Sequence, residues 1–269
     1  MKNIHLFSLL SLFALLVFCC GNINNPGEYT NHYSSDYDNT TGIKNDTVID
    51  KNYLLGKFSP EQHPGFIKID PSHTTKQNIY LRKEAYEAFV RMKNSAKKEN
   101  ISLTIVSGTR NFDSQKSIWE AKWNGQRKVE VYDLTTIQDP VERARMILRY
   151  SSMPGTSRHH WGTDIDINSV SPAYFESEQG KKTYTWLVAH APDFGFCQTY
   201  TPKDSLRPTG YEEEQWHWSY IPIAGLLTTQ YQKQITHDDI NGFDGAETAT
   251  DIDVIKNYVM GINKTCIQH

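Results

Sequence analysis

The stretch SRHHWGTDID, residues 157–166, contains the features that decide the fold of this chain. From position 163 onward apolar and polar residues alternate, which predicts a short strand with Asp166 on its polar face. His159 precedes Gly162, so a turn must bring His159 round towards Asp166. An aspartate between two isoleucines is costly to bury unless it is paired or binds a metal. The stretch therefore predicts a His and an Asp that meet at one end of a strand.

Two more segments supply compatible side chains. Glu214 lies three positions before His217, and Arg110 ends the Ser-Gly-Thr-Arg segment that starts at Ser107. Two histidines and one carboxylate form a common catalytic zinc set that leaves a coordination position open for water. A neighbouring glutamate that is not a ligand can take the proton of that water, and an arginine can stabilise the oxyanion that forms at a carbonyl. These residue types are the inventory of a metallopeptidase.

The segments also contain competing side chains. His160 shares the alternation parity of Asp166, so spacing alone does not exclude it as a ligand, and Asp164 competes in the same way. Glu214 ends a run of three acidic residues, which by itself would indicate a solvated loop. Only the joint occurrence of the three segments favours a metal site over separate structural roles.

Apolar spacing around Phe89 predicts a helix over 82–99. Asp113 and Asp139 are the expected N-caps of the next two helices. Further helices are predicted over 114–123, 140–150, 178–191 and 249–262, and strands over 101–106, from 163, and around 216–220. Because strands and helices mix without regular β–α alternation, the predicted fold class is α+β in a single domain.

At this point the residues resemble a known family. The pattern Ser-x-His-x-x-Gly-x-x-x-Asp over 157–166, followed by Glu-x-x-His over 214–217, is similar to that of the zinc D-alanyl-D-alanine carboxypeptidases and dipeptidases of the VanY/VanX type. The upstream Ser-Gly-x-Arg, with Gln115 five positions after the arginine, also matches. The resemblance spans about residues 100–220 and implies a small antiparallel sheet flanked by helices, as in the hedgehog signalling domain.

The resemblance also implies a role for each residue. The implied zinc ligands are His159, Asp166 and His217. Glu214 would be the general base and later the acid, and Arg110 would steady the scissile carbonyl oxygen or the substrate. Gln115 and Ser157 would contact the substrate. The chain departs from the family pattern at Asp164 and Gln215; neither is an implied ligand, and an acid at 164 is expected to affect substrate preference.

These features predict a zinc-dependent D-alanyl-D-alanine carboxypeptidase that acts on peptidoglycan stem peptides. An alternative is a zinc-stabilised cell-wall or ligand-binding module without turnover, although Glu214 and Arg110 are not needed in such a module. Within the enzyme class, an L,D-carboxypeptidase or an L-alanyl-D-glutamate endopeptidase remains open, because bond choice depends on pocket shape. The formal net charge of −3 gives no indication of nucleic acid binding.

The N-terminus has the features of a targeting segment. An apolar run from Ile4 to Phe18 ends at Cys19 and Cys20, and it is shorter than the roughly 20 residues of a spanning helix. It resembles a bacterial lipoprotein signal, in which cleavage prefers a small residue before the lipidated cysteine. Cys20 is therefore the expected lipidation site, with Cys19 and a plain secretory peptide as alternatives.

The chain is accordingly expected to have three parts: a lipoprotein signal peptide at 1–19, a lipidated cysteine with a flexible tether at 20–50, and a zinc peptidase domain at 51–269. The tether is polar and has few, unpatterned apolar residues, which is typical of disorder. The expected location is the bacterial cell envelope, exported and anchored to the membrane by lipid. Cys197 and Cys266 can form a disulfide in such a compartment or remain buried thiols, and the sequence does not decide between these states.

Overall fold

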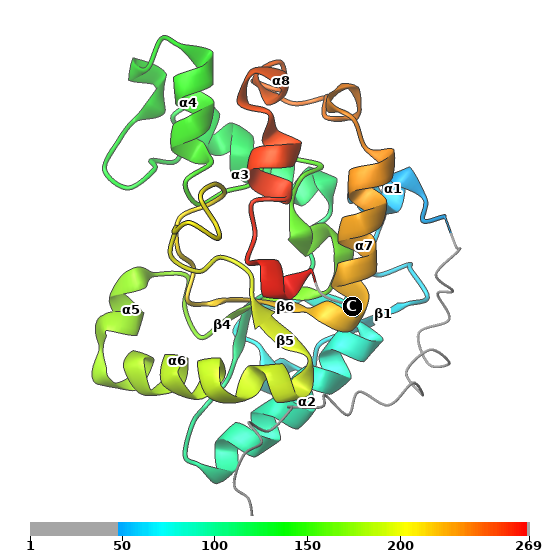
Figure 1. Cartoon of the computed structure of the whole chain (residues 1–269), viewed down its shortest axis with the longest axis vertical. Coiled ribbons are helices and arrows are strands. Elements are labelled where there is room, and N and C mark those ends of the chain that lie inside the picture. Colours follow the sequence, from blue (N-terminus) through cyan, green and yellow to red (C-terminus); the bar gives the residue numbers. More distant parts are fainter. Residues whose placement is uncertain (1–47, 268–269) are drawn as a thin grey trace, which may run out of the picture. The chain divides into compact units, whose positions relative to one another are not determined.

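A four-stranded antiparallel sheet forms the centre of the computed structural model, which describes residues 48–267. Its strand order is β3-β4-β6-β5 (Figure 1). The strands are β3 Ile105–Ser107, β4 Asp164–Ile167, β5 Phe196–Gln198 and β6 His217–Tyr220. A second antiparallel pair joins β1 Phe66–Lys68 to β2 Tyr80–Arg82. The predicted α+β class with a small antiparallel sheet is confirmed.

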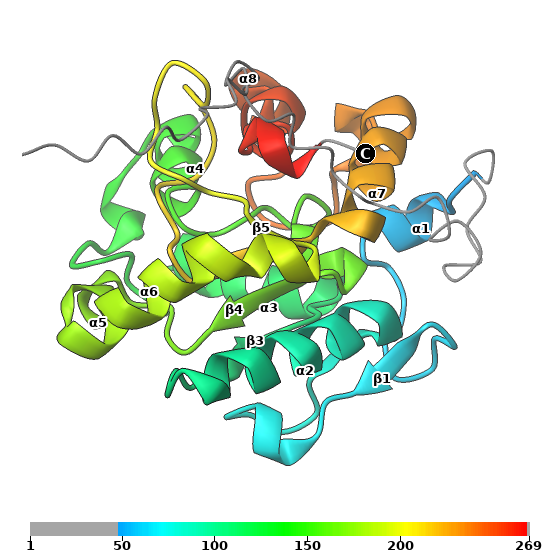
Figure 2. The ribbon, with the colours of Figure 1, turned by 60° about the horizontal axis from the view of Figure 1, so that its bottom comes forward.

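Helices cover both faces of the central sheet. In chain order they are α1 Lys51–Leu54, α2 Lys83–Lys98, α3 Phe112–Trp123, α4 Pro140–Ile147, α5 Pro172–Glu176, α6 Glu178–His190, α7 Ile221–Gln234 and α8 Thr248–Ile252. Figures 1 and 2 show α2 and α6 on one side of the sheet, and α3, α4, α7 and α8 on the other. Ile165 and Ile167 pack with α2 and α6 in one apolar cluster, while α3, α4 and α8 form a second cluster on the opposite face. Burial of both faces explains why all four residues of β4 are buried.

The register of β4 and β6 places the polar side chains in rows. Asp166 pairs with His217 and Asp164 pairs with Ser219 in the antiparallel ladder. Residues two apart on a strand point to the same face, so these four side chains share the face opposite Ile165. The β3 residue Ser107 pairs with Asp166 from the other side. The centre of the sheet therefore carries the predicted strand aspartate directly beside the predicted strand histidine.

A turn at Gly162 brings His159 to this face. His159 lies in the short 3-10 helix η4, Arg158–Trp161, which Gly162 terminates with φ 72°. Such a left-handed conformation favours glycine. A Cβ atom at position 162 would also collide with the ring of Phe66. The predicted turn between His159 and Asp166 is thus present. Both its backbone conformation and the closeness of Phe66 favour glycine at position 162.

Other predicted elements needed correction. The cap of α3 is Asn111, whose side chain accepts from Ser114 N at 2.9 Å, and not Asp113. The cap at Asp139 is confirmed, because its carboxylate accepts from Val141 N at 2.8 Å. The predicted helix over 249–262 is broken at Asp253, which has φ 50° and separates α8 from a single π-helical segment. The elements β1, β2, β5, α1, α5 and α7 were not anticipated.

Cys197 on β5 and Cys266 in the last turn form a disulfide, with Cα atoms 5.6 Å apart. The bond joins residues 69 apart and ties the C-terminal segment to an edge strand. Closing a loop of that length restricts the unfolded chain and so favours the fold. The signal peptide, Cys19, Cys20 and the tether as far as residue 47 lie outside the described residues. Within 48–267 no helix is both long and apolar enough to cross a membrane.

Candidate metal centre

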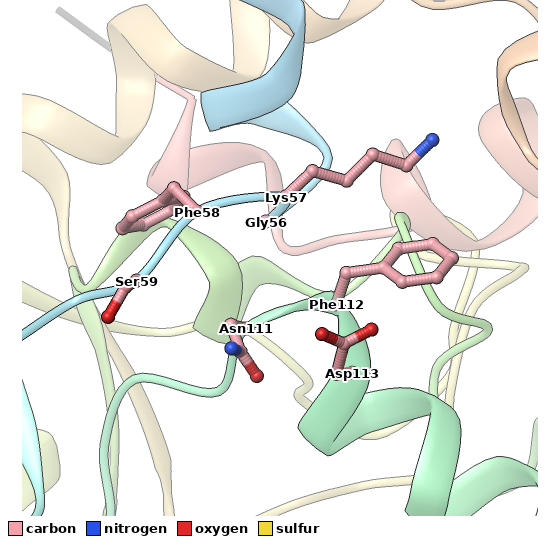
Figure 3. Close-up of a pocket in the computed structure, with 7 residues that line it drawn as sticks. All are labelled: Gly56, Lys57, Phe58, Ser59, Asn111, Phe112 and Asp113. Carbon is pink, nitrogen blue, oxygen red and sulfur yellow. The ribbon is translucent and has the colours of Figure 1, made fainter.

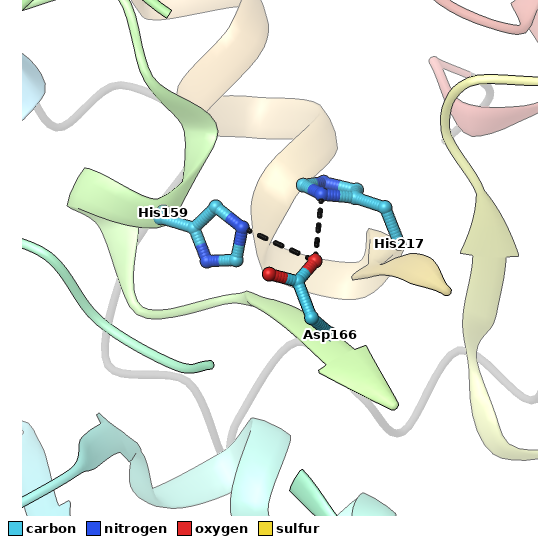
Figure 4. Close-up of side chains that lie close together, drawn as sticks. All are labelled: His159, Asp166 and His217. Carbon is cyan, nitrogen blue, oxygen red and sulfur yellow. Dashed lines mark ion pairs between the residues drawn. The ribbon is translucent and has the colours of Figure 1, made fainter. Parts of the chain in front are cut away.

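Three side chains meet on the polar face of the sheet. His159 from η4, Asp166 from β4 and His217 from β6 place one potential ligand atom each within 4.8 Å of the others. Figure 4 shows both imidazole rings directed at the carboxylate. His159 Nε2 lies 3.5 Å and His217 Nδ1 3.2 Å from the same oxygen, Asp166 Oδ1. The structure thus brings together the three residues expected as metal ligands.

A backbone carbonyl orients the ring of His159. Its Nδ1 lies 2.8 Å from the carbonyl oxygen of Gly108, which can only accept a hydrogen bond. Nδ1 therefore carries the proton, and in the neutral ring Nε2 presents a lone pair towards Asp166. This is the usual way in which an outer partner fixes the tautomer of a metal-binding histidine.

His217 is oriented by a second carboxylate. Its Nε2 lies 2.8 Å from Asp164 Oδ2, to which it donates a hydrogen bond. In the neutral ring Nδ1 then presents a lone pair that faces Asp166 Oδ1, and Glu214 Oε2 at 3.5 Å. An acceptor that faces two carboxylate oxygens needs a cation or a proton between them.

Asp166 completes this arrangement. It is 3% exposed, and its Oδ1 accepts no hydrogen bond despite its closeness to two ring nitrogens, because neither contact has hydrogen-bond geometry. A buried carboxylate oxygen without a partner is rare and requires an explanation. Two imidazole lone pairs and one unpartnered carboxylate oxygen match the donor set of a catalytic zinc site. The residues therefore fit a bound divalent metal.

Protonation in the metal-free protein follows the same logic. Burial opposes the charged form of His217, but the hydrogen bond to Asp164 and the negative charges of Asp164 and Asp166 outweigh it and raise the pKa of His217 to about 9. Burial and the nearby Arg110 lower the pKa of His159. Burial also disfavours ionisation of Asp166, yet the two imidazoles hold its pKa below the ordinary value. One proton on His217 can thus occupy the position that a metal cation would take.

Glu214 lies beside the cluster without being central to it. The backbone N–H of His217 donates to the carbonyl of Glu214 at 3.2 Å, so a tight turn folds this glutamate over its partner. Burial raises the pKa of Glu214 to about 8, although the neighbouring His217 opposes that rise. Glu212 instead pairs with Lys203 at the surface, and Glu213 contacts Tyr184. Of the three acids, only Glu214 is buried at the site.

Arg110 borders the cluster on its other side. Its Nη1 donates to Ser107 Oγ at 2.9 Å and lies 3.9 Å from Asp166 Oδ2. Its Nε is buried and has no partner among the described residues. The side chain is 26% exposed, so a ligand can reach the guanidinium. Arg110 therefore has at least one N–H donor, at Nε, that is not used by the described residues and lies near the predicted metal position.

The structure separates His160 from the cluster. Its Nδ1 lies 2.6 Å from the carbonyl oxygen of Arg110, and its Nε2 accepts from Gly155 N at 3.0 Å. Both ring nitrogens are therefore used by the backbone, which gives His160 a structural role in holding the loop of Arg110. Of the two adjacent histidines, only His159 is directed at Asp166.

Gln115 and Ser157 are buried, and each has an atom without a partner. Gln115 Nε2 donates to the carbonyl of Ser152 at 2.8 Å, whereas its Oε1 and Ser157 Oγ have no hydrogen-bond partner among the described residues. Neither forms a hydrogen bond to the three-residue cluster. Free acceptors of this kind are consistent with a role towards a ligand, which stays a prediction.

Arg158 and Ser219 were not expected at the site, and Asp164 was considered there only as a competing ligand and for substrate preference. Asp164 is fully buried and accepts four hydrogen bonds, so it does not contact a substrate directly, and its effect on substrate preference stays a prediction. The period-two spacing that relates Asp164 to Asp166 and Ser219 to His217 was a visible signal. Arg158 contributes from η4, and only the folded chain shows that it reaches this position.

An open cavity of about 480 Å³ lies on the neighbouring surface (Figure 3). It is lined by two segments, Gly56–Ser59 and Asn111–Asp113, and contains none of the cluster residues. The chemistry of the side chains, and not this cavity, marks the site.

Comparison with known proteins agrees with the geometry. The sequence model of the VanY family, D-alanyl-D-alanine carboxypeptidase, matches residues 78–223. The chain is 32% identical over 182 residues to YodJ of Bacillus subtilis (strain 168), covering 65% of this chain and 59% of that protein. It is 27% identical over 147 residues to a D-alanyl-D-alanine carboxypeptidase of Enterococcus faecalis (strain ATCC 700802 / V583), covering 55% of this chain and 50% of that protein.

The chain thus spans between half and three fifths of the length of these relatives. Among solved structures, VanYB in complex with D-Alanine-D-Alanine is 21% identical, with a TM-score of 0.45, and the match covers 64% of this chain and 86% of that chain. The range 78–223 includes β3, β4 and β6 and every residue of the three-residue cluster.

Proposed function

The chain belongs to the VanY family of D-alanyl-D-alanine carboxypeptidases, and on that premise we propose that it is a zinc-dependent peptidase that removes the terminal D-alanine from peptidoglycan stem peptides. The observation that carries the proposal is the unpartnered Asp166 Oδ1 between the ring nitrogens of His159 and His217. A purely structural cluster would satisfy that oxygen with a hydrogen bond.

The residues around the ligands supply the rest of the chemistry. Zinc, when bound, acts as a Lewis acid that polarises a carbonyl and lowers the pKa of water. Glu214 would take the proton of the attacking water and pass it to the leaving amine. Its raised pKa, about 8 without metal, suits both halves of this exchange, because a group near neutrality can accept and release a proton.

Arg110 has a separate task in this proposal. Its half-buried guanidinium, in which Nε has no partner among the described residues, can donate to the oxyanion that develops on the scissile carbonyl, or to the substrate carboxylate. Gln115 and Ser157 would hold the peptide through their free oxygen atoms. Retention of a base and an oxyanion donor favours turnover over a binding module, since stabilising the fold requires neither.

The test is the release of D-alanine from stem peptides. Purified protein would be incubated with stem tetra- and pentapeptides, with added zinc or with a chelator, and the products identified by mass spectrometry. Loss of one D-alanine from the pentapeptide, abolished by the chelator, is the expected result. Loss from the tetrapeptide alone would assign an L,D-carboxypeptidase, and internal cleavage an endopeptidase. If the zinc-loaded protein cleaves neither peptide, the result would favour the alternative of a binding module without turnover.

We also propose that the protein acts at the bacterial cell envelope, anchored through lipid on Cys20. The apolar run that ends at Cys19 and Cys20, with a polar stretch behind it, supports this proposal. A flexible tether of this length has a root-mean-square span of roughly 30 Å, enough to reach nearby wall. Membrane fractionation of wild type beside Cys20→Ser and Cys19→Ser checks it. Release by Cys20→Ser alone is expected, and an unmodified soluble wild-type protein would contradict the anchor.

A further inference from the structure

We propose that Asp164, clamped by Arg158, is a positioning residue that holds His217 with its Nδ1 directed at the metal. The inference rests on the proposed function for the identity of the metal and adds a role for two residues outside the ligand set. It follows from the hydrogen bonds of a fully buried group of side chains behind His217.

Each carboxylate oxygen of Asp164 accepts two hydrogen bonds. Oδ2 accepts from His217 Nε2 at 2.8 Å and from Arg158 Nε at 3.1 Å. Oδ1 accepts from the hydroxyls of Thr163 and Ser219, both at 2.8 Å. With four bonds the carboxylate cannot rotate without losing partners, so the direction of its bond to His217 is fixed.

Arg158 is fixed equally well. Its Nη1 donates to Thr228 Oγ1 and its Nη2 to Ser219 Oγ, both at 2.8 Å, while its Nε holds Asp164. The guanidinium also lies 4.8 Å from the centre of the Trp161 ring. Arg158 is 1% and Asp164 0% exposed, so the ion pair is completely removed from water.

A buried ion pair is an expensive way to stabilise a fold, because desolvation of two charges can exceed their attraction. Its placement gives it another use. A carboxylate that accepts from the far nitrogen of a metal-binding histidine fixes the tautomer and the ring orientation, and it raises the basicity of the near nitrogen. Arg158 supplies the counter-charge that keeps Asp164 ionised without a proton from solvent.

A purely structural role is the alternative, since Arg158 also links η4 to Thr228 of α7. Zinc affinity separates the two roles when it is measured beside thermal stability. A structural pair would alter the melting temperature of the metal-free protein and leave the zinc dissociation constant of the folded protein unchanged. A positioning pair would alter the dissociation constant itself.

Two variants and one control make the experiment. Asp164→Asn keeps an oxygen that can accept from His217 but removes the charge. Arg158→Met with Asp164→Leu replaces the whole pair by apolar side chains of similar volume, an exchange that folds often tolerate. Arg82→Met with Glu84→Leu is the control, because that pair, at 2.9 Å, is partly buried and its side chains form no hydrogen bond to the three ligands.

Zinc dissociation constants would be measured by competition with a chromophoric chelator, with melting temperatures of the metal-free proteins alongside. We expect about 10-fold weaker zinc binding for Asp164→Asn, up to about 100-fold for the double variant, and no change for the control. In zinc-loaded wild type, 15N NMR should show His217 protonated at Nε2. Affinities within threefold of wild type for both Asp164 variants would overturn the inference.

If the double variant fails to fold, Asp164→Asn and the NMR signal still decide the inference. Failure of the proposed function shows itself differently. Wild-type protein that binds zinc but releases no D-alanine would refute the reaction and leave the role of Asp164 to the affinity ranking.

Discussion

Two aspartates on the same strand, two residues apart and on the same face, have opposite hydrogen-bond environments. Asp164 accepts four hydrogen bonds from protein groups, whereas Oδ1 of Asp166 accepts none. Both are buried, at 0% and 3% exposure, so burial does not distinguish them. The complete set of partners at Asp164 fits the proposed support, and the unpartnered Oδ1 of Asp166 fits the proposed metal ligand. The number of partners at each buried oxygen therefore supports different proposed roles for two aspartates that spacing alone does not distinguish.

The largest expected effect, on zinc binding and turnover, comes from replacing Asp166, the proposed ligand of the two aspartates. Asp166→Ala should weaken zinc binding by more than the roughly 10–100-fold expected for an outer partner such as Asp164, and turnover should fall to background. Zinc content after dialysis and D-alanine release would be measured for Asp166→Ala and Asp164→Asn in parallel. Equal zinc loss in the two variants would contradict the distinction between Asp166 as a ligand and Asp164 as the support of His217.

A change at Glu214 tests whether this third acid is a metal ligand, like Asp166, or acts without binding the metal. Glu214→Gln should lower kcat by about 10²–10⁴-fold, because it removes a general base, while zinc stays bound. The matched control is Glu213→Gln, one position away and only partly buried. Zinc lost together with activity would make Glu214 a ligand, and near-normal turnover would remove it from the mechanism.

At Arg110 the expected loss is smaller. Arg110→Lys should reduce kcat/KM by about 10–10²-fold on a stem peptide, because a single ammonium does not reproduce the planar fork of donors. Zinc affinity should stay close to that of wild type, since Arg110 is not a ligand. Full catalytic efficiency in Arg110→Lys would reduce the role of this residue to diffuse charge.

The smallest expected effect concerns stability of the metal-free protein. Burial raises the pKa of Glu214 from an ordinary 4.5 to about 8. Between these values the folded state holds a proton that the unfolded state has released, so stability falls as pH rises through this window. Glu214→Gln lacks that proton and should lose less stability between pH 5 and 8, as melting temperatures would show. An identical pH dependence in both proteins would contradict the shift.

Much of this site could be predicted from sequence because its information is local. Alternation along β4 and β6 placed Asp166 and His217 on strands, and Gly162 marked the turn that returns His159. The support of His217 could not be predicted, since Arg158 and Thr228 are 70 residues apart and meet only in the folded chain. Spacing alone left His159 and His160 open, the family resemblance implied His159, and the backbone carbonyl that each ring reaches explains why only His159 is directed at Asp166.

The same reason explains the errors in the fold. The helix α7 begins at Ile221, directly after β6, with Pro222 in its first turn. Its buried residues Ile223, Leu227 and Tyr231 are four apart, a helical spacing that the prediction missed because the strand pattern of β6 runs straight into it. The break at Asp253 is a left-handed residue that interrupts an otherwise helical apolar pattern. Asp113 was expected to cap α3, but the helix begins at Phe112, which makes Asn111 the cap and places Asp113 in the first turn. Local patterns gave the type of element, and tertiary packing set its ends.

The central claim is that one metal binds between His159, Asp166 and His217. A crystal structure of the zinc-soaked protein, with anomalous diffraction recorded at the zinc absorption edge, tests it most directly. A single anomalous peak is predicted between Nε2 of His159, Nδ1 of His217 and Oδ1 of Asp166. A peak at His160, at the Asp164 side of His217, or no peak in this group of residues would contradict the account.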